Sequence, residues 1–321
     1  MSEQYSITNI TKKTLAKSER FDSGAEQKYK IPWTQVDPNR EQLAIFKIDT
    51  EPSQVSRVWI EKLAGELAIA MGLPTATYEM CETEDNQRGI ASPSYLKNGG
   101  VEQPGIVLMQ EAFETNSVLY TVENALAVFD LLDIKLPSGY TPPPEIRTAK
   151  DLFIGYLLHS YWIDDPDFHA RNWGTQTNLN GDRELLPNYD YGRALVDFPI
   201  VNNRLEIFAE RLAATRTCAF VNNDGKEIKM DEMVAILERI SPITTQYWSE
   251  QIAQASAEQL NPICDLFPLG WGSPERIDFA RVFINYNSQR LEQLIEVENQ
   301  TTIDYPDDSP EPPAAPLTSH D

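Results

Sequence analysis

The stretch Asp-Asp-Pro-Asp-Phe-His-Ala-Arg-Asn-Trp-Gly, residues 164–174, is the densest polar cluster of the sequence. It directly follows an apolar segment, residues 149–163, whose spacing predicts a helix. Within it Asp167 and Asn172 stand five residues apart, so a single loop offers an acid and an amide. Asp and Asn are also ordinary loop-forming residues, so this stretch alone leaves a purely structural loop open.

A second acid, Asp190, follows 23 residues after Asp167 in the stretch Pro-Asn-Tyr-Asp-Tyr-Gly, residues 187–192. It lies after an apolar strand and before an aromatic-Gly turn, as does the Mg²⁺-binding Asp of the Asp-Phe-Gly element in protein kinases. A kinase catalytic loop also carries an acid and an amide at the spacing of Asp167 and Asn172. Two oxygen ligands from separate loops can hold Mg²⁺. The two stretches therefore agree in order and spacing with phosphoryl-transfer chemistry.

Upstream, the run Ala-Ile-Phe-Lys, residues 44–47, closes an apolar strand with a lysine. Apolar residues then recur at spacings of three and four over residues 55–71, which predicts an amphipathic helix that stops at Gly72-Leu73-Pro74. That helix carries Glu61, a candidate ionic partner for Lys47. Charges on such a helix also form ordinary solvated faces, so the pairing is a hypothesis at this point.

A short turn, Asp22-Ser23-Gly24-Ala25, precedes these elements. Its backbone N–H groups could bind phosphate as an anion nest. One glycine is a weak pattern, and an ordinary turn is the alternative interpretation.

Taken together, these segments resemble the HipA-like kinases, bacterial Ser/Thr protein kinases best known as toxins of toxin–antitoxin pairs. Glu61 stands eleven residues before Gly72-Leu73-Pro74, as does the glutamate of that family. The other matching segments, in chain order, are residues 23–28 (family Ser-Gly-x-Gln-Pro-Lys), Phe46-Lys47, 107–113 (the hinge that ends in Arg-Phe-Asp-Arg), 167–172 (Asp-x-His-x-Lys-Asn) and 186–190 (Ala-Pro-x-Tyr-Asp).

The resemblance implies a two-lobed, protein-kinase-like α+β fold and an ATP- and Mg²⁺-dependent Ser/Thr protein kinase. In that scheme Asn172 and Asp190 bind Mg²⁺ and Asp167 orients the attacking hydroxyl. His169 either faces the transferred phosphoryl group or braces the loop. Adenine would lie against the backbone near Met109 to Glu111. The cofactor-binding residues implied are Ser23, Gly24, Ala25, Lys47, Glu61, Met109 and Glu111.

The resemblance further implies a protein substrate with a Ser or Thr hydroxyl and an antitoxin-type partner. Family members usually carry a subdomain before the phosphate loop that contacts a DNA-binding antitoxin, whereas 22 residues precede Ser23 here. Two alternatives stay open. One is a small-molecule kinase of the same fold, and the other is a pseudokinase that binds nucleotide to regulate a partner.

The patterns divide the chain into a strand-rich lobe (1–115), a helical lobe (116–300) and an acidic, proline-rich tail (301–321) that we expect to be disordered. In the first lobe we expect strands near 5–15, 43–48, 75–81 and 106–109. In the second we expect helices at 122–132, 149–163, 230–239, 245–256 and 274–297, with strands flanking 178–183.

Composition restricts the classes of protein. The 321 residues include 27 Lys plus Arg and 49 Asp plus Glu, a net charge of −22. Such a chain repels phosphate backbones and anionic membranes, so we expect no direct nucleic-acid or membrane partner. Three widely separated cysteines argue against a disulfide framework, and no apolar run is long enough to span a bilayer. We expect a cytoplasmic location.

Overall fold

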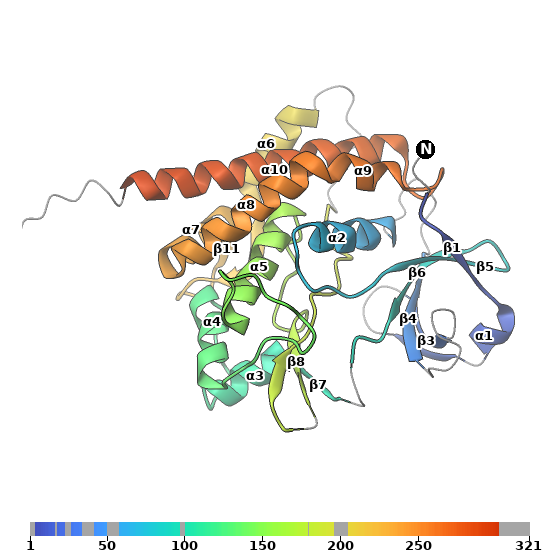
Figure 1. Cartoon of the computed structure of the whole chain (residues 1–321), viewed down its shortest axis with the longest axis horizontal. Helices are drawn as coiled ribbons and strands as arrows, with labels where there is room; N and C mark the ends of the chain where they lie inside the picture. The colour runs from blue at the N-terminus through green and yellow to red at the C-terminus, as the bar shows by residue number, and fades with distance from the viewer. Residues whose placement is uncertain are drawn as a thin grey trace, which may run out of the picture.

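The computed structural model describes residues 4–16, 18–22, 27–33, 42–49, 58–96, 100–178, 180–195 and 205–301. The expected phosphate turn Ser23-Gly24-Ala25 and residues 302–321 of the expected tail lie outside these ranges. The described chain forms a small sheet followed by a larger helical part (Figure 1). This is the α+β arrangement that the sequence predicts.

A six-stranded sheet forms the amino-terminal part, in the order β1-β5-β6-β4-β3-β2. Neighbouring strands are antiparallel except β1 and β5, which are parallel. Helix α1 (Lys12–Ala16) follows the first strand. The strands are β1 (Ile7–Ile10), β2 (Glu19–Asp22), β3 (Gln27–Trp33), β4 (Gln42–Ile48), β5 (Glu79–Thr83) and β6 (Arg88–Pro93).

The alternation of side chains along β4 determines which face the lysine occupies. Ala44, Phe46 and Ile48 are buried in a small apolar core on one face of the sheet. Successive side chains of a strand point to opposite faces, so Ile45 and Lys47 lie on the other face. That second face is turned toward helix α2 and the helical part.

Helix α2 (Val58–Ala70) packs on β5 and β6. It is rich in residues with good helix propensity, and most of its side chains are buried. The helix ends just before Gly72, whose φ of +83° is the left-handed conformation that a glycine adopts at little cost. The expected helix is thus present over its described residues.

Helix α5 lies at the centre of the helical part. It begins with a capping box between Thr148 and Asp151, and apart from Lys150 and Asp151 all of its residues are buried, as expected of a helix with apolar contacts on every side. The helices of this part are α3 (Gly105–Ala112), α4 (Val122–Leu131), α5 (Ala149–Trp162), α6 (Leu205–Thr215), α7 (Met230–Ile240), α8 (Pro242–Glu258), α9 (Leu260–Asp265) and α10 (Pro274–Thr301).

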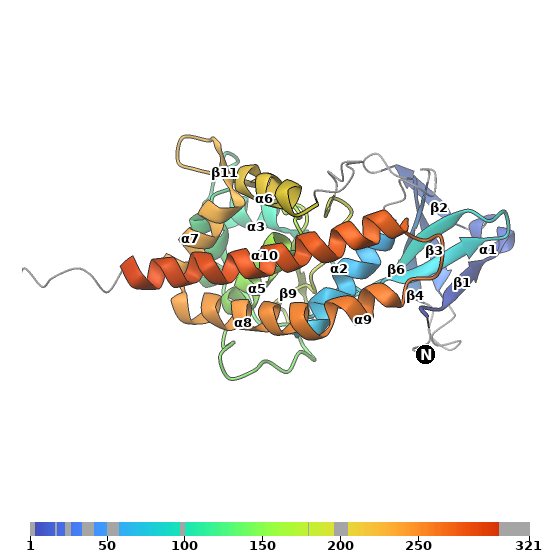
Figure 2. The ribbon, with the colours of Figure 1, turned by 90° about the horizontal axis from the view of Figure 1, so that it is seen from above.

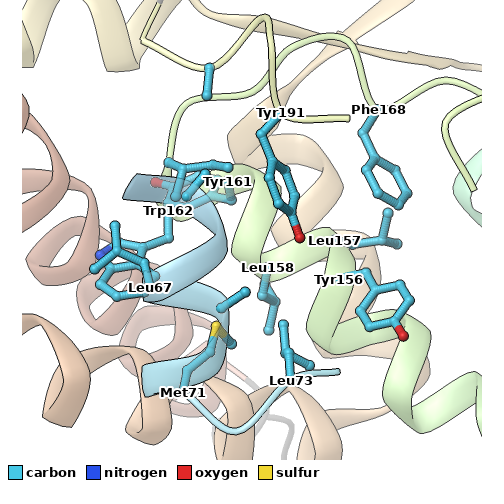
Figure 3. Packing of buried hydrophobic residues seen from close by; sticks show 14 of the residues in the cluster. Leu67, Met71, Leu73, Tyr156, Leu157, Leu158, Tyr161, Trp162, Phe168 and Tyr191 are labelled. Carbon is cyan, nitrogen blue, oxygen red and sulfur yellow. The ribbon is translucent and has the colours of Figure 1, made fainter. Parts of the chain in front are cut away.

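One continuous apolar core joins α2 to the helical part. Leu67 and Met71 meet Leu158 and Trp162 of α5, and the ring of Tyr191 enters the same core (Figure 3). The face of the sheet that carries Phe46 has a separate core. The position of α2 is therefore coupled to the helical part as well as to the sheet.

Two small sheets complete the fold. Strand β7 (Glu102–Pro104) pairs with β8 (Gly174–Thr177), which pairs with β9 (Arg183–Leu185), and all these pairs are antiparallel. Strands β10 (Thr217–Val221) and β11 (Glu227–Lys229) form a hairpin. The expected pair of strands around residues 178–183 is present as β8 and β9.

The strand expected at 106–109 is wrong, because these residues lie in helix α3. A run of four apolar residues is compatible with a strand or a buried helix, and only the contacts decide. Here Pro104 caps the helix, and Leu108 and Met109 are buried. Since α3 packs on α4 and β7 pairs with β8, residues 102–112 join the helical part, whereas the sequence placed the change of lobe near residue 115.

The three cysteines, Cys81, Cys218 and Cys264, are buried and free. Among the described residues, no helix has both the length and the apolar character needed to cross a membrane.

Candidate active site

Lys47 is the centre of the site. Its Nζ lies 2.7 Å from Glu61 Oε1 and 2.8 Å from Asp190 Oδ1. Glu61 lies in the first turn of α2, where the helix dipole favours a carboxylate. Lys47 therefore joins three elements that are distant in sequence, namely β4, α2 and the segment after β9.

Asp190 is held in an unusual backbone conformation. Its φ of +65° is left-handed, which Asp tolerates better than most residues. Its backbone N–H donates to Tyr78 Oη at 2.9 Å. Burial would raise the pKa of this carboxyl group, but the charge and hydrogen bond of Lys47, with the charges of Lys28 and His169, lower it. Asp190 is therefore ionised at neutral pH.

These residues line a cavity between the sheet and the helical part. Three neighbouring strands supply one wall, because Lys28 and Ile90 are the register partners of Lys47 on either side. All three side chains line the cavity. The remaining lining residues are Ile45, Glu61, Tyr78, Ser92, Tyr95, Glu102, Tyr189 and Asp190.

Aromatic residues also line the cavity. Tyr95 and Tyr189 stack with ring centroids 5.2 Å apart, and Tyr189 Oη donates to Glu102 Oε1 at 2.7 Å. Tyr95 lies two residues after the end of β6, and Glu102 is the first residue of β7. The lining of the cavity thus combines the charged groups of Lys28, Lys47, Glu61 and Asp190 with aromatic rings.

The loop after α5 has a backbone fixed by its own side chains. Asp165 Oδ1 accepts the backbone N–H of Asp167 at 3.1 Å, and the Asn172 side-chain amide donates to the Asp167 carbonyl at 2.8 Å. The Asp167 and His169 side chains are left half exposed, with Nε2 of His169 3.9 Å from Oδ1 of Asp167. The loop therefore presents an acid and an imidazole to solvent on a rigid frame.

Two further acids anchor this loop. Asp164 has a φ of +53° and binds the Arg216 guanidinium through both carboxylate oxygens. Asp165 is 2% exposed, and burial, with the charges of Asp167, Asp190 and Asp164, raises its pKa to about 8 despite the backbone N–H of Asp167. Asp165 is consequently close enough to Asp190 for their charges to interact.

His159 connects α2 to the segment that carries Asp190. Its Nε2 lies 3.0 Å from the Ala64 carbonyl of α2, and its Nδ1 lies 3.4 Å from the Asn188 amide nitrogen. Burial lowers the pKa of His159 to about 3, and the Ala64 carbonyl opposes this only in part. A neutral imidazole that donates from Nε2 and accepts at Nδ1 satisfies both contacts.

The structure does not bring Met109 and Glu111 to the cavity. Both lie on α3, where Met109 is fully buried and Glu111 binds Arg183 at 2.7 Å. Of the lining residues, sequence reasoning named Lys47, Glu61 and Asp190 as site residues and missed the other eight. Tyr189 adjoins Asp190 and Lys28 ends the segment matched to the phosphate loop, so both carried a local signal, whereas Tyr95 and Glu102 carried none.

The oxygen ligands present suit Mg²⁺ better than a metal that needs an all-protein site. No group of three or more His, Cys, Asp or Glu residues in the described part of the chain could hold a metal ion. Asp190 could offer a carboxylate to such an ion, and Asn172 could offer its amide oxygen, because its amide nitrogen is engaged by the Asp167 carbonyl. One or two protein oxygens with phosphate oxygens are the usual ligands of Mg²⁺.

Comparison with known proteins finds similarity in structure only. No protein-family model matches the sequence, and no curated protein matches it significantly. The proinflammatory kinase CtkA of Helicobacter pylori superposes with a TM-score of 0.61 at 13% identity, over 91% of this chain and 98% of its own. HipA of Shewanella oneidensis MR-1, solved with HipB and operator DNA, gives a TM-score of 0.56 at 13% identity, over 88% of this chain and 67% of its own.

At 13% sequence identity, the similarity to these two kinases shows the fold alone. The chain therefore has the two-part fold of these kinases, and the resemblance to HipA-like kinases drawn from the sequence is confirmed at the level of the fold.

Proposed function

We propose that this chain is an ATP- and Mg²⁺-dependent Ser/Thr protein kinase. The observation that carries the proposal is the position of Lys47, whose Nζ contacts Glu61 and Asp190 in the lining of a cavity between the sheet and the helical part. A lysine paired with a helix glutamate, beside an acid that can bind metal, is the arrangement that kinases use to hold nucleotide phosphates.

The cavity suggests how the nucleotide lies. Lys28 and Lys47 supply positive charge for the phosphates. The apolar and aromatic side chains of the lining, Ile45, Ile90 and Tyr95, suit the adenine ring. We therefore propose that adenine lies against Tyr95 and Glu102 and not near Met109 and Glu111. The sequence matched to the phosphate loop, Ser23-Gly24-Ala25, would cover the phosphates.

Asn172 and Asp190 would hold the metal. Bound Mg²⁺ would neutralise and orient the phosphate oxygens. The lowered pKa of Asp190 keeps its carboxylate ionised for this task. Asp190 Oδ1 lies 2.8 Å from Lys47 Nζ, so the proposed metal ligand stands beside the proposed phosphate-binding lysine.

Asp167 would orient the substrate hydroxyl and accept its proton. Its side chain is solvent-accessible, while its backbone is fixed by Asp165 and Asn172. His169 would brace the loop, because its Nδ1 accepts the backbone N–H of Arg171 at 3.3 Å. Facing the transferred phosphoryl group is the alternative role, and its charge is near enough to Asp190 to lower the pKa of that residue. The rate would come from positioning and electrostatics, with no covalent enzyme intermediate.

We also propose a protein substrate, an antitoxin-type partner and a cytoplasmic location. HipA of Shewanella oneidensis is found with HipB and operator DNA, which supports a partner of this class. We propose no direct contact of this chain with nucleic acid, because its net charge is −22.

Thermal unfolding with Mg²⁺ and ATP tests the site. At a ligand concentration near 100 Kd, we expect the melting temperature of the wild type to rise by about 5 °C. EDTA and Asp190→Ala should each abolish this rise, because both remove metal from the phosphates. The exposed Asp182→Ala is the matched control and should keep it.

Transfer from [γ-³²P]ATP to a lysate, followed by identification of the labelled species, tests the reaction. Label on protein Ser or Thr supports the proposal. Label on a small molecule would assign a small-molecule kinase, and nucleotide binding without transfer would assign a pseudokinase. A thermal shift that survives both EDTA and Asp190→Ala would contradict the metal site.

A further inference from the structure

The connector between α9 and α10, residues 266–273, reaches from the helical part to the sheet and α2. Helix α9 packs on both α2 and α10, and the connector joins α9 to α10 beside the strands (Figure 2). The backbone N–H of Tyr5, near the start of the described chain, donates to the Leu266 carbonyl at 2.9 Å.

The connector packs on the outer face of α2. Phe267 meets Trp59 edge to face, with ring centroids 5.7 Å apart, and meets Tyr5 at 5.1 Å. A Cβ at Gly272 would lie 3.3 Å from the Trp59 ring and 3.1 Å from Ile277, so glycine allows this close approach. Trp59 is 2% exposed, which makes these contacts part of the core.

A second contact reaches strand β6. The Arg88 guanidinium donates to the Gly270 carbonyl and lies 5.4 Å from the Trp271 ring centre. Gly270 has a φ of +86°, a left-handed conformation that favours glycine. Ile90, two residues after Arg88 in β6, is the register partner of Lys47. The connector is thus attached close to both partners of the Lys47–Glu61 pair.

Trp59 and Glu61 point in opposite directions. Two positions along an α-helix correspond to a rotation of about 200°, so the side that faces the connector is opposite the side that faces the cavity. Glu61 lines the cavity, while Trp59 packs on the connector. Any outward movement of α2 would have to displace the connector.

We propose that the α9–α10 connector is a positioning element for the active site. Through Phe267 on Trp59 and Gly270 on Arg88, it holds α2 at the distance from β4 at which Glu61 orients Lys47. This inference rests on the proposed function for its kinetic consequence. The positioning of α2 itself is a structural property and is measurable without any reaction.

Arg88→Leu is the first test, because Arg88 is partly exposed and its loss should not prevent folding. Arg183→Leu is the matched control, since its side chain is 25% exposed against 30% for Arg88 and its partner Glu111 lies within the helical part. Hydrogen exchange of residues 58–70 should become about tenfold faster in Arg88→Leu. It should stay at the wild-type rate in Arg183→Leu.

Phosphoryl transfer gives the second measurement. Arg88→Leu should lower kcat by about tenfold, with a change of less than about threefold in the Kd for Mg-ATP. In a Glu61→Gln background, Arg88→Leu should lower kcat by less than about twofold, because the connector acts through Glu61. Phe267→Leu, which keeps an apolar side chain but loses the ring contacts, should reproduce this pattern.

Unchanged exchange of α2 in both Arg88→Leu and Phe267→Leu would overturn the inference. The inference would also be overturned if Arg88→Leu lowered kcat by the same factor in the Glu61→Gln background as in the wild type. The connector would then act independently of Glu61. If the wild type transfers no phosphoryl group at all, the proposed function fails. Faster exchange confined to α2 would still support the connector as its positioning element.

Discussion

The two sides of the proposed site differ in how completely their side chains are paired and buried. We call them the β4–α2 wall, which lines the cavity, and the loop wall, residues 164–174, which is not among the lining residues. On the wall made by β4 and α2, the side chains of Lys47 and Glu61 are only 10% and 3% exposed and lie 2.7 Å apart. On the loop wall, the side chains of Asp167 and His169 are 41% and 42% exposed and lie 3.9 Å apart. The first wall is buried and paired, and the second is open.

This difference suits a division between binding and chemistry. Desolvating Lys47 and Glu61 has a large energetic cost, and folding meets it through their mutual contact. Their geometry is therefore set before nucleotide arrives. Asp167 has to meet an incoming hydroxyl, so its side chain stays accessible while the loop backbone is held by Asp165 and Asn172.

Asp167→Asn should have the largest effect on the reaction. The change keeps the size of the side chain and removes the charge that orients the hydroxyl. We expect kcat to fall by roughly 10²–10⁴-fold, with a change of less than about tenfold in the Kd for Mg-ATP. Steady-state transfer and calorimetric titration measure the two quantities. Asp133→Asn, at an exposed acid, is the control, and undiminished transfer in Asp167→Asn would shift attention to Asp165.

Lys47→Met should act on binding instead. It removes the cation shared by Glu61 and Asp190, so we expect the Kd for Mg-ATP to rise by about tenfold or more. Lys62→Met is the matched control, because Lys62 is similarly buried, at 11% exposure, but binds Glu66 and does not line the cavity. If both lysine variants weaken ATP binding equally, the proposed division between the two walls is wrong.

The sequence predicted the parts of the site that depend on local pattern. The period of residues 55–71 identified the α2 helix, and the apolar run before Lys47 identified its strand. The fixed spacing from Glu61 to Gly72 selected that glutamate over Glu66. The structure brings Lys47, Glu61 and Asp190 together, although they span 143 residues from Lys47 to Asp190.

Features that depend on pairing between distant segments escaped prediction. Glu102 lies in β7, whose pairing with β8 no local pattern encodes. The resemblance to HipA-like kinases implies a hinge at 107–113, whereas residues 105–112 form helix α3 and none of them is among the residues that line the cavity. The contact of Phe267 with Trp59 joins residues far apart in the chain, and the short helix α9 carries too few residues for a clear period.

Asp165→Asn should have the smallest effect on transfer and sharpen the comparison in another way. Asp165 belongs to the exposed loop but is itself buried. The variant therefore tests the residues that hold the loop backbone separately from the exposed side chains of Asp167 and His169. Asparagine can still accept the backbone N–H of Asp167, and we expect kcat to change by less than about threefold. We expect Asp165→Asn to differ from the wild type in thermal stability instead.

The sign of that difference follows from the pKa of Asp165, raised from 3.8 to about 8 by burial and by the neighbouring acids. Between these values the folded protein binds more protons than the unfolded chain, so stability falls as pH rises from about 4 to about 8. Asp165→Asn removes this cost and should melt a few degrees above the wild type at pH 9, with no difference near pH 4. Asp164→Asn should instead melt below the wild type at neutral pH, since it removes the ion pair of Asp164 with Arg216. If Asp165→Asn and the wild type melted at equal temperatures at every pH, Asp165 would be solvated. The residues that hold the loop backbone would then be as exposed to solvent as Asp167 and His169.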